Sequence, residues 1–340
     1  MLSRIRKIFR RNIGIDLGTA NTLIYLEEEG IVFNEPTVIA ISESGRVLDV
    51  GARACSYLGR TPPGIMALRP MARGVISDFE AVANFIESIL YMVRDHRALL
   101  APNVVVCVPS NITRIEQRTV LDAVMEADIH DVWLMEEVMA AAVGAGAAYQ
   151  GAPPAMVVDI GGGTTEAAVI GDMAYLACET LRVAGDEMNN AVERYMRRNH
   201  SLVISSSSAE RLKWKAGAVP GWQGETVRVQ VSGKDAMTAM PATCEVTSDE
   251  LSTVFQSILD DIVDMVQGVV RQLDMETLHH VSRGQAILTG GGALLRGMDQ
   301  YLSDHCGIGF QLADRPLETV IDGAGKAVEN LPAFRSVFIN

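Results

Sequence analysis

An acidic residue that closes an apolar strand and is followed by glycine and threonine occurs twice in this chain. The first case lies in IGIDLGTANTLIYL at residues 13–26, and the second in MVVDIGGGTTEAAVI at residues 156–170. Each segment is typical of two strands joined by a glycine-bearing turn. This internal echo predicts two structurally related halves with a ligand site between them.

Both turns have the composition of a phosphate-binding loop. Glycine lets backbone N–H groups approach phosphate oxygens closely, and an acid at the strand end can hold hydrated Mg²⁺ through its waters. A third turn, Thr289-Gly-Gly-Gly, follows a predicted strand at 286–288 and precedes a predicted helix, where backbone passes close to a base or a phosphate. One such turn is weak evidence, but three in order, each after an apolar strand, predict a nucleotide site.

Strand-like and helix-like segments alternate along both halves, which predicts an α/β fold. Helical spacing covers residues 78–93 and 248–273, the run 104–108 is typical of a covered strand, and a Ser-rich loop at 205–208 is expected before a helix from Ala209. At 340 residues the chain exceeds one ordinary core. We expect one lobe over 12–150, a second over 151–326 whose final helix returns toward the first, and a tail over 327–340.

Composition excludes several function classes. The net charge of −13, with aromatics at only 5%, argues against a nucleic-acid binder, because such binding needs clustered cations or stacking platforms. The five cysteines are scattered without a CxxC pair, so neither a zinc site nor a disulfide framework is indicated, and a reducing cytoplasm fits best. No apolar run approaches the roughly 20 residues that span a bilayer.

The first eleven residues differ from the rest because they carry five basic side chains and no acidic one. At about 100° per residue, the apolar residues of this segment fall within an arc of roughly 120° that excludes every cation. They are Met1, Leu2, Ile5, Ile8 and Phe9. This segregation predicts a helix that lies in the interface of an anionic membrane.

Five segments carry a resemblance to a known family: IDLGTANTLIY, NEPTVIAI, VVVCVPS, MVVDIGGGTTE and LTGGGALLRG. Their order resembles the two phosphate turns and the adenosine turn of the actin, sugar kinase and heat-shock chaperone ATPase superfamily. Their wording resembles MreB, the bacterial actins, from Asn12 to Lys326. The resemblance implies a two-lobed actin-like ATPase fold, each lobe a mixed β-sheet flanked by helices, with ATP in the cleft between the lobes.

The resemblance also implies roles for single residues. Asp16 and Asp159 would organise Mg²⁺ through water. The residues expected to line the phosphates are Gly18, Thr19, Ala20, Asn21, Gly161, Gly162, Gly163 and Thr164. Glu210 and Lys213 match the stretch that contacts ribose and adenine, and Gly290, Gly291, Gly292 and Ala293 would lie across the base. For Glu210 and Lys213 the alternative is an exposed helical ion pair, which contributes little.

For hydrolysis, the resemblance implies that Glu137 positions the attacking water, with Thr164 as a second orienting group. Phosphoryl transfer to water needs positioning more than a strong base. The alternative for Glu137 is a purely structural role in the first turn of its helix. Val138 stands where the family usually has proline, so this turn is less constrained and slow hydrolysis with intact nucleotide binding is expected.

Leu99 and Leu100, in DHRALLAPN, resemble the membrane-inserting loop of the family, although for this pair taken alone burial within the protein is the favoured interpretation. A single short helix binds a membrane weakly, so stable attachment requires many copies, as in a filament. The resemblance implies a self-assembling protein on the inner face of the cytoplasmic membrane. Its expected partners are RodZ, MreC, MreD and the peptidoglycan synthesis machinery.

Two other functions of the same superfamily remain alternatives: a small-molecule kinase, for which we find no separate candidate base, and an actin that positions plasmids or organelles. A chaperone is not expected, because the residues after 326 are too few for a peptide-binding domain.

Overall fold

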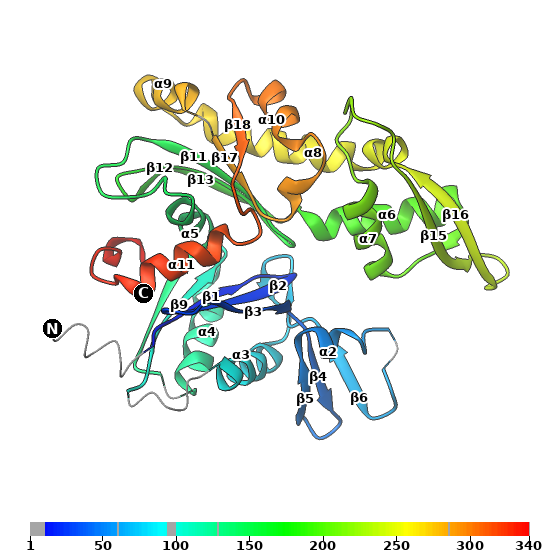
Figure 1. Ribbon diagram of the computed structural model, residues 1–340, viewed down its shortest axis with the longest axis horizontal. Coiled ribbons are helices and arrows are strands. Elements are labelled where there is room, and N and C mark those ends of the chain that lie inside the picture. The colour runs from blue at the N-terminus through cyan, green and yellow to red at the C-terminus, as the bar shows by residue number, and fades with distance from the viewer. Residues whose placement is uncertain (1–10, 60, 94–99, 128, 285, 340) are drawn as a thin grey trace. The chain divides into compact units, whose positions relative to one another are not determined.

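The computed structural model describes residues 11–59, 61–93, 100–127, 129–284 and 286–339 (Figure 1). The chain divides into two compact units. Unit 1 contains the chain up to Pro153, the segment Ile170–Tyr175 and the chain from Leu317 onward, whereas unit 2 contains Pro154–Val169 and Leu176–Pro316. Each unit has its own hydrophobic core and is described by itself.

Unit 1 is built on a five-stranded sheet in the order β10-β9-β1-β2-β3. Its strands are β1 (Ile13–Leu17), β2 (Asn21–Leu26), β3 (Gly30–Pro36), β9 (Asn103–Val108) and β10 (Asp131–Glu136). The run predicted to be a covered strand is β9, which is paired on both sides and buried from Val104 to Val108. Because β1, β9 and β10 run parallel, their carboxyl ends meet at one edge of the sheet.

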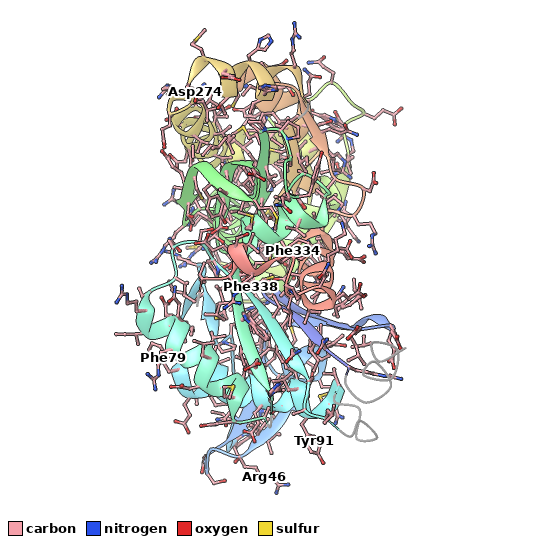
Figure 2. All side chains as sticks on the ribbon, turned by 90° about the vertical axis from the view of Figure 1, so that its left-hand side faces the viewer. Arg46, Phe79, Tyr91, Asp274, Phe334 and Phe338 are labelled. Carbon is pink, nitrogen blue, oxygen red and sulfur yellow. The ribbon has the colours of Figure 1, made fainter. Side chains whose placement is uncertain are left out.

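Four helices flank this sheet: α3 (Phe79–Val93), α4 (Arg114–Met125), α5 (Glu137–Gly144) and α11 (Thr319–Glu329). Helices α3 and α4 pack against each other and share a core with the sheet, while α5 and α11 pack together (Figure 1). The predicted apolar face of α3 is buried at Val82 and Phe85, but Phe79 in its first turn is 47% exposed (Figure 2). The residue that begins the helix therefore lies outside the buried stripe.

Glycines set the spacing between α5 and α11. A Cβ atom on Gly323 would lie 1.9 Å from the carbonyl oxygen of Ala140, and one on Gly144 would lie 1.9 Å from that of Thr319. Side chains at these positions would separate the two backbones. Lys326 then donates from Nζ to the carbonyl oxygen of Gly144 at 2.7 Å, which satisfies the end of α5.

The remaining strands of unit 1 form small sheets. Strands β4 (Ile39–Ser42), β5 (Val47–Val50) and β6 (Ile65–Leu68) pair beside α2 (Gly51–Cys55), and β7 (Met71–Ala72) pairs with β8 (Val75–Ile76). The apolar tail packs on β10: the Ile339 N–H donates to the Leu134 carbonyl at 3.0 Å, and the Phe338 and Trp133 ring centroids lie 6.0 Å apart (Figure 2).

Unit 2 is centred on a sheet in the order β13-β12-β11-β17-β18, formed by β11 (Ala155–Ile160), β12 (Thr165–Gly171), β13 (Ala174–Leu181), β17 (Ala286–Thr289) and β18 (Phe310–Leu312). The turn between β12 and β13 belongs to unit 1. A second sheet contains β14 (Leu202–Val203), β15 (Arg228–Asp235) and β16 (Pro241–Thr247). The helices are α6 (Gly185–Asn199), α7 (Ser206–Ala216), α8 (Ser248–Arg271), α9 (Met275–Arg283) and α10 (Met298–Cys306).

The Ser-rich segment is not the predicted loop. Ser205 is the N-cap of α7, and its hydroxyl accepts from the Ser208 N–H at 3.2 Å, so the helix begins at Ser206 rather than Ala209. Serine disfavours helix interiors but is preferred at caps, because its hydroxyl satisfies a free N–H group.

The start of α8 is fixed by the carboxylate of Glu250. This carboxylate accepts from the Thr247 N–H at 2.7 Å, completing a capping box, and from the Tyr195 hydroxyl at 2.9 Å, while His200 Nε2 lies 3.1 Å away. Burial alone would raise the pKa of Glu250, but the hydrogen bonds from Thr247 and Tyr195 and the charge of His200 outweigh it and lower that pKa. The ionised carboxylate thus joins α6 to α8.

We predict that Glu250→Gln lowers the free energy of unfolding by about 1 kcal/mol at pH 7. A carboxyl group whose pKa is lowered by folding stabilises the protein above its unfolded pKa, and this stability is lost as pH falls through the folded pKa. The difference between variant and wild type, measured by denaturant titration, should therefore shrink below about pH 4.5. The exposed Glu276→Gln is the control; a Glu250→Gln difference that does not change with pH would contradict the assignment.

Candidate nucleotide site

The first glycine turn joins β1 to β2 in unit 1. A Cβ atom on Gly18 would lie 2.6 Å from the carbonyl oxygen of Asn21, so glycine is required there. The Thr37 hydroxyl donates to the carbonyl oxygen of Gly18 at 2.7 Å and lies 2.9 Å from the hydroxyl of Thr22. The buried threonines Thr22 and Thr37 therefore hold the turn in place from its buried side.

The following residues of this turn are braced by a neighbouring loop. The Thr19 hydroxyl accepts from the Gly74 N–H at 3.1 Å, which leaves its own proton to donate to an anion. The carbonyl oxygen of Ala20 accepts from the Thr37 N–H at 2.9 Å and from Arg69 at 3.3 Å. This carbonyl therefore has two protein donors.

Two acids meet at the carboxyl edge of β1, β9 and β10. Asp16 pairs in register with Cys107 on the neighbouring parallel strand, and Glu137 begins α5 directly after β10. Burial raises the pKa of Asp16 to about 7. Burial also raises the pKa of Cys107 well above its ordinary value, and the charges of Asp16 and Glu137 raise it further. A cation at this edge would offset the cost of ionising Asp16, so the residues present fit a hydrated divalent ion.

The second glycine turn joins β11 to β12 in unit 2. The Gly161 N–H donates to the carbonyl oxygen of Thr164 at 2.9 Å and closes the turn. The carbonyl oxygens of Gly161 and Gly162 accept from the first N–H groups of α6, those of Gly185 at 3.2 Å and Asp186 at 2.8 Å. Thr164 is buried beneath this turn, and Gly163 is buried with it.

The third glycine turn lies directly beside the second. Strand β11 pairs in parallel with β17, which sets Asp159 opposite Thr289. Gly290 has a φ of +85°, and a Cβ atom there would lie 2.2 Å from Oδ1 of Asp159. A Cβ atom on Gly292 would lie 2.2 Å from the side chain of Ile160. Turns two and three therefore pack directly against each other, and this close approach requires glycine at two places.

Helical structure follows the third turn, as predicted, but in two separate parts. Residues Gly292–Leu294, including the buried Ala293, form a short 3₁₀ helix, and α10 begins only at Met298 after a left-handed Gly297.

Glu210 and Lys213 lie on α7, but they are not the exposed pair that was considered as an alternative. Both are half-buried, and Lys213 donates from Nζ to the carbonyl oxygen of Gly185 at 3.0 Å. Burial lowers the pKa of Lys213, and the charges of Glu210 and Asp186 oppose that shift. Lys213 therefore reaches the start of α6 and the second glycine turn.

The predicted membrane residues are only partly described. Met1, Leu2, Ile5, Ile8, Phe9 and Leu99 lie outside the described residues. Leu100 is 45% exposed, so the interpretation of burial is wrong for this residue. Every helix within the described ranges is too short or too polar to cross a bilayer.

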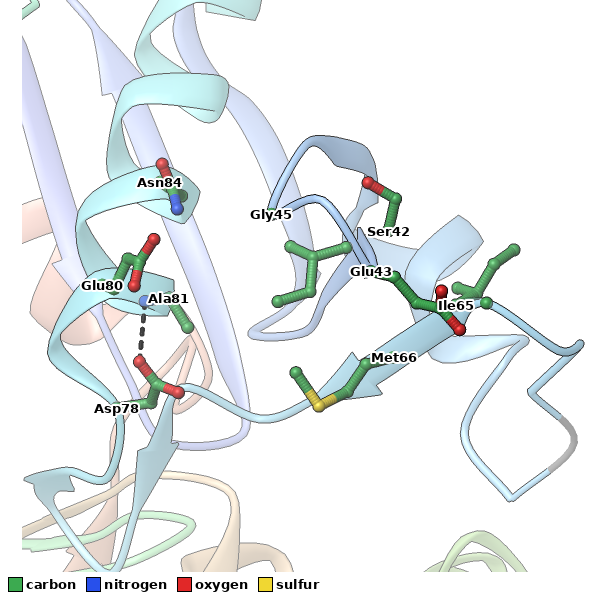
Figure 3. A pocket seen from close by; sticks show the side chains of 11 residues that line it. Ser42, Glu43, Gly45, Ile65, Met66, Asp78, Glu80, Ala81 and Asn84 are labelled. Carbon is green, nitrogen blue, oxygen red and sulfur yellow. Dashed lines mark hydrogen bonds between the residues drawn. The ribbon is translucent and has the colours of Figure 1, made fainter.

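A pocket of about 380 Å³ lies elsewhere in unit 1, between the β4–β6 sheet and the start of α3 (Figure 3). Its wall combines the apolar side chains of Ile65 and Met66 with the carboxylates of Glu43, Asp78 and Glu80. The Asp78 carboxylate accepts from the Ala81 N–H at 2.9 Å and so caps the N-terminus of α3. The residues of the predicted nucleotide turns do not line this pocket.

In the part of the chain that the structure describes, no group of three or more His, Cys, Asp or Glu side chains gathers to ligate a metal directly. Water-mediated binding of Mg²⁺ by Asp16 and Asp159, and the placement of one nucleotide between the halves, stay predictions.

Comparison with known proteins decides the family. The model of the MreB/Mbl protein family matches residues 10–336. The chain belongs to the MreB/Mbl family. It is 39% identical over 336 residues to the cell shape-determining protein MreB of Escherichia coli strain K12, covering 97% of this chain and 96% of that one. It is 37% identical over 326 residues to the cell shape-determining protein Mbl of Bacillus cereus, covering 95% of this chain and 97% of that one.

A solved MreB/Mbl relative has the same fold. The crystal structure of MreB5 of Spiroplasma citri bound to AMPPNP is similar with a TM-score of 0.87 and 27% identity, covering 95% of this chain and 97% of that one. The predicted family and the predicted actin-like α/β fold are therefore confirmed.

The residues that brace the glycine turns were not predicted as part of the site. Thr37, Gly74 and Arg69 brace the first turn from loops 15 to 55 residues away in sequence, and Gly185 braces the second. NEPTVIAI, which contains Thr37, carried part of the family resemblance, so only this brace was marked by a motif.

We predict that Gly290→Ala lowers the melting temperature of the MreB/Mbl chain by several degrees, because its Cβ would overlap the Asp159 carboxylate. Gly307→Ala is the matched control, since Gly307 also has a positive φ of +69° but open space around its Cβ position. Equal melting temperatures for the two variants, measured by circular dichroism, would show that backbone strain and not the contact with Asp159 makes glycine necessary.

Proposed function

We propose that this chain is an ATP-binding bacterial actin that assembles into filaments on the inner face of the cytoplasmic membrane and organises cell-wall elongation and rod shape. The observation that carries the proposal is the 39% identity to a cell shape-determining MreB over 97% of the chain, with all three glycine turns inside the matched region. The AMPPNP bound by the similar MreB5 supports nucleotide binding.

The turns supply the chemistry for binding a triphosphate. Thr19 and the backbone N–H groups around Gly18 would hold one part of the phosphate chain, and those of Gly161 to Gly163 another. Asp16 and Asp159 would hold hydrated Mg²⁺, which when bound neutralises charge on the phosphates. The base would lie against the Gly290 to Ala293 turn, with Glu210 near the ribose.

Hydrolysis is proposed to depend on two residues. Glu137, at the first position of α5, would accept a hydrogen bond from the attacking water, and Thr164 would orient the same water. Val138 is buried, so it anchors this turn by packing rather than by a fixed φ angle. This anchoring leaves Glu137 less constrained than a proline would, and slow hydrolysis follows.

Attachment to the membrane is proposed to be additive. The N-terminal basic apolar segment binds anionic lipid weakly in one copy, and a filament multiplies that affinity. The exposed side chain of Leu100 supports a second contact with the membrane. RodZ, MreC, MreD and the peptidoglycan synthesis machinery are the partners proposed on the basis of the family.

The test is electron microscopy of the purified chain on anionic liposomes with Mg²⁺-ATP, beside a nucleotide-free sample. Nucleotide-dependent filaments lying on the membrane are expected. A variant lacking residues 1–9 should still form filaments, but these should no longer bind the liposomes. A monodisperse chain that binds ATP and never polymerises would overturn the proposal in favour of a small-molecule kinase or a non-assembling relative.

We predict that Glu137→Ala reduces the rate of phosphate release from ATP by roughly 100-fold, because the attacking water is no longer positioned. The affinity for ATP should stay within about twofold of the wild-type value. Phosphate release under single-turnover conditions and binding of a fluorescent ATP analogue measure the two quantities. Glu136→Ala, at the neighbouring N-cap position, is the control for disturbance of α5. Hydrolysis by Glu137→Ala at the wild-type rate would rule out this role.

A further inference from the structure

A continuous set of hydrogen bonds joins α7 to the second glycine turn. Lys213 Nζ donates to the carbonyl oxygen of Gly185 at 3.0 Å, and the N–H of the same Gly185 donates to the carbonyl oxygen of Gly161 at 3.2 Å. The backbone N–H of the next residue, Asp186, donates to the carbonyl oxygen of Gly162 at 2.8 Å. Lys213 therefore holds the residue of α6 that holds the turn.

The direction of these bonds determines where the turn directs its donors. In a trans peptide the C=O and the following N–H point to opposite sides. The carbonyls of Gly161 and Gly162 face α6, so the N–H groups of Gly162 and Gly163 face away from it. These are two of the N–H groups proposed to bind phosphate, and their orientation depends on the position of Gly185.

Gly185 fits closely between its two neighbours. A Cβ atom at this position would lie 3.1 Å from Lys213 Nζ and 3.2 Å from the carbonyl oxygen of Gly161. Gly185 is buried, and the N–H groups at the start of α6 have no partner within their own helix. The turn satisfies two of them, which makes the contact costly to break.

We propose that Lys213 is a positioning residue of the second phosphate turn, acting through Gly185 to orient the N–H groups of Gly162 and Gly163. The inference rests on the proposed binding of ATP. It differs from the role implied by the family resemblance, in which Lys213 contacts ribose and adenine directly. The two roles predict opposite responses to the two ends of the nucleotide.

The experiment compares Lys213→Met with wild type in binding two fragments, adenosine and inorganic tripolyphosphate, each measured by displacement of a fluorescent ATP analogue. Methionine keeps the apolar stem but removes the donor. We expect the affinity for tripolyphosphate to fall roughly tenfold, the effect of one charged hydrogen bond, and that for adenosine to change less than about twofold. Lys215→Met, at an exposed position of the same helix, is the matched control and should change neither.

A second variant approaches the same link from its other end. Gly185→Ala inserts a methyl group between Lys213 Nζ and Gly161, so it should produce the same selective loss of tripolyphosphate binding. Melting curves of both variants establish that they fold. Added Mg²⁺ is not expected to restore tripolyphosphate binding, because the variants disturb the orientation of the backbone N–H donors.

Each other outcome decides against the inference. A loss of adenosine binding with unchanged tripolyphosphate binding would show that Lys213 contacts the nucleoside instead. Unchanged binding of both fragments by both variants would remove any role for the link, while the proposed ATP binding would stand. A folded wild-type chain that binds neither ATP nor either fragment would overturn the proposed function together with this inference.

Discussion

The second glycine turn is held by its carbonyl oxygens, and the candidate site of unit 2 depends on this arrangement. Because peptide groups are planar, hydrogen bonds that fix the carbonyl oxygens of the turn also fix the direction of its N–H groups. An anion can then bind to these N–H groups without any reorganisation of the turn. The helix supplies donors that would otherwise lack partners. The parallel pairing of β11 with β17 then places the third turn against Asp159, where a side chain larger than hydrogen does not fit.

Unit 1 solves the same problem with different contacts. Its first turn follows the same Asp-x-Gly pattern, yet its supports are hydroxyl groups and a loop amide, chiefly Thr37 and Gly74, rather than a helix terminus. The sequence echo therefore corresponds to shared strand geometry, whereas the bracing contacts have diverged. Asp16 also shares its sheet edge with Cys107 and Glu137, so unit 1 brings two acidic groups, Asp16 and Glu137, close to the Cys107 thiol where Glu137 is proposed to orient water.

Most of the secondary structure and all three turns were predictable, because periodicity and glycine placement are local signals. Helix α8 and strand β9 lie where their patterns indicated. Strand β13 and helix α9 were missed, since the first mixes half-buried and polar residues and the second is short. The serines at the N-cap and in the first turn of α7 were predicted to form a loop, because serine has opposite preferences at a cap and in a helix interior. The braces from Arg69, Gly74 and Gly185 could not be predicted, since each is a contact between residues distant in sequence.

The packing of α11 on α5 has a consequence for synthesis on the ribosome. Helix α11 spans Thr319–Glu329, yet it belongs to unit 1, whose other strands and helices are almost all made before Pro153. The residues that it contacts closely, which include the small residues Gly14 and Ala140, belong to early parts of the chain, whereas α11 is nearly the last element to be made. In a nascent chain the residues that pack against α11 therefore stay uncovered while unit 2 is translated, at a stage when domains made first would ordinarily have folded. Contacts between residues this distant in sequence form slowly, so unit 1 is completed only after unit 2 has been made.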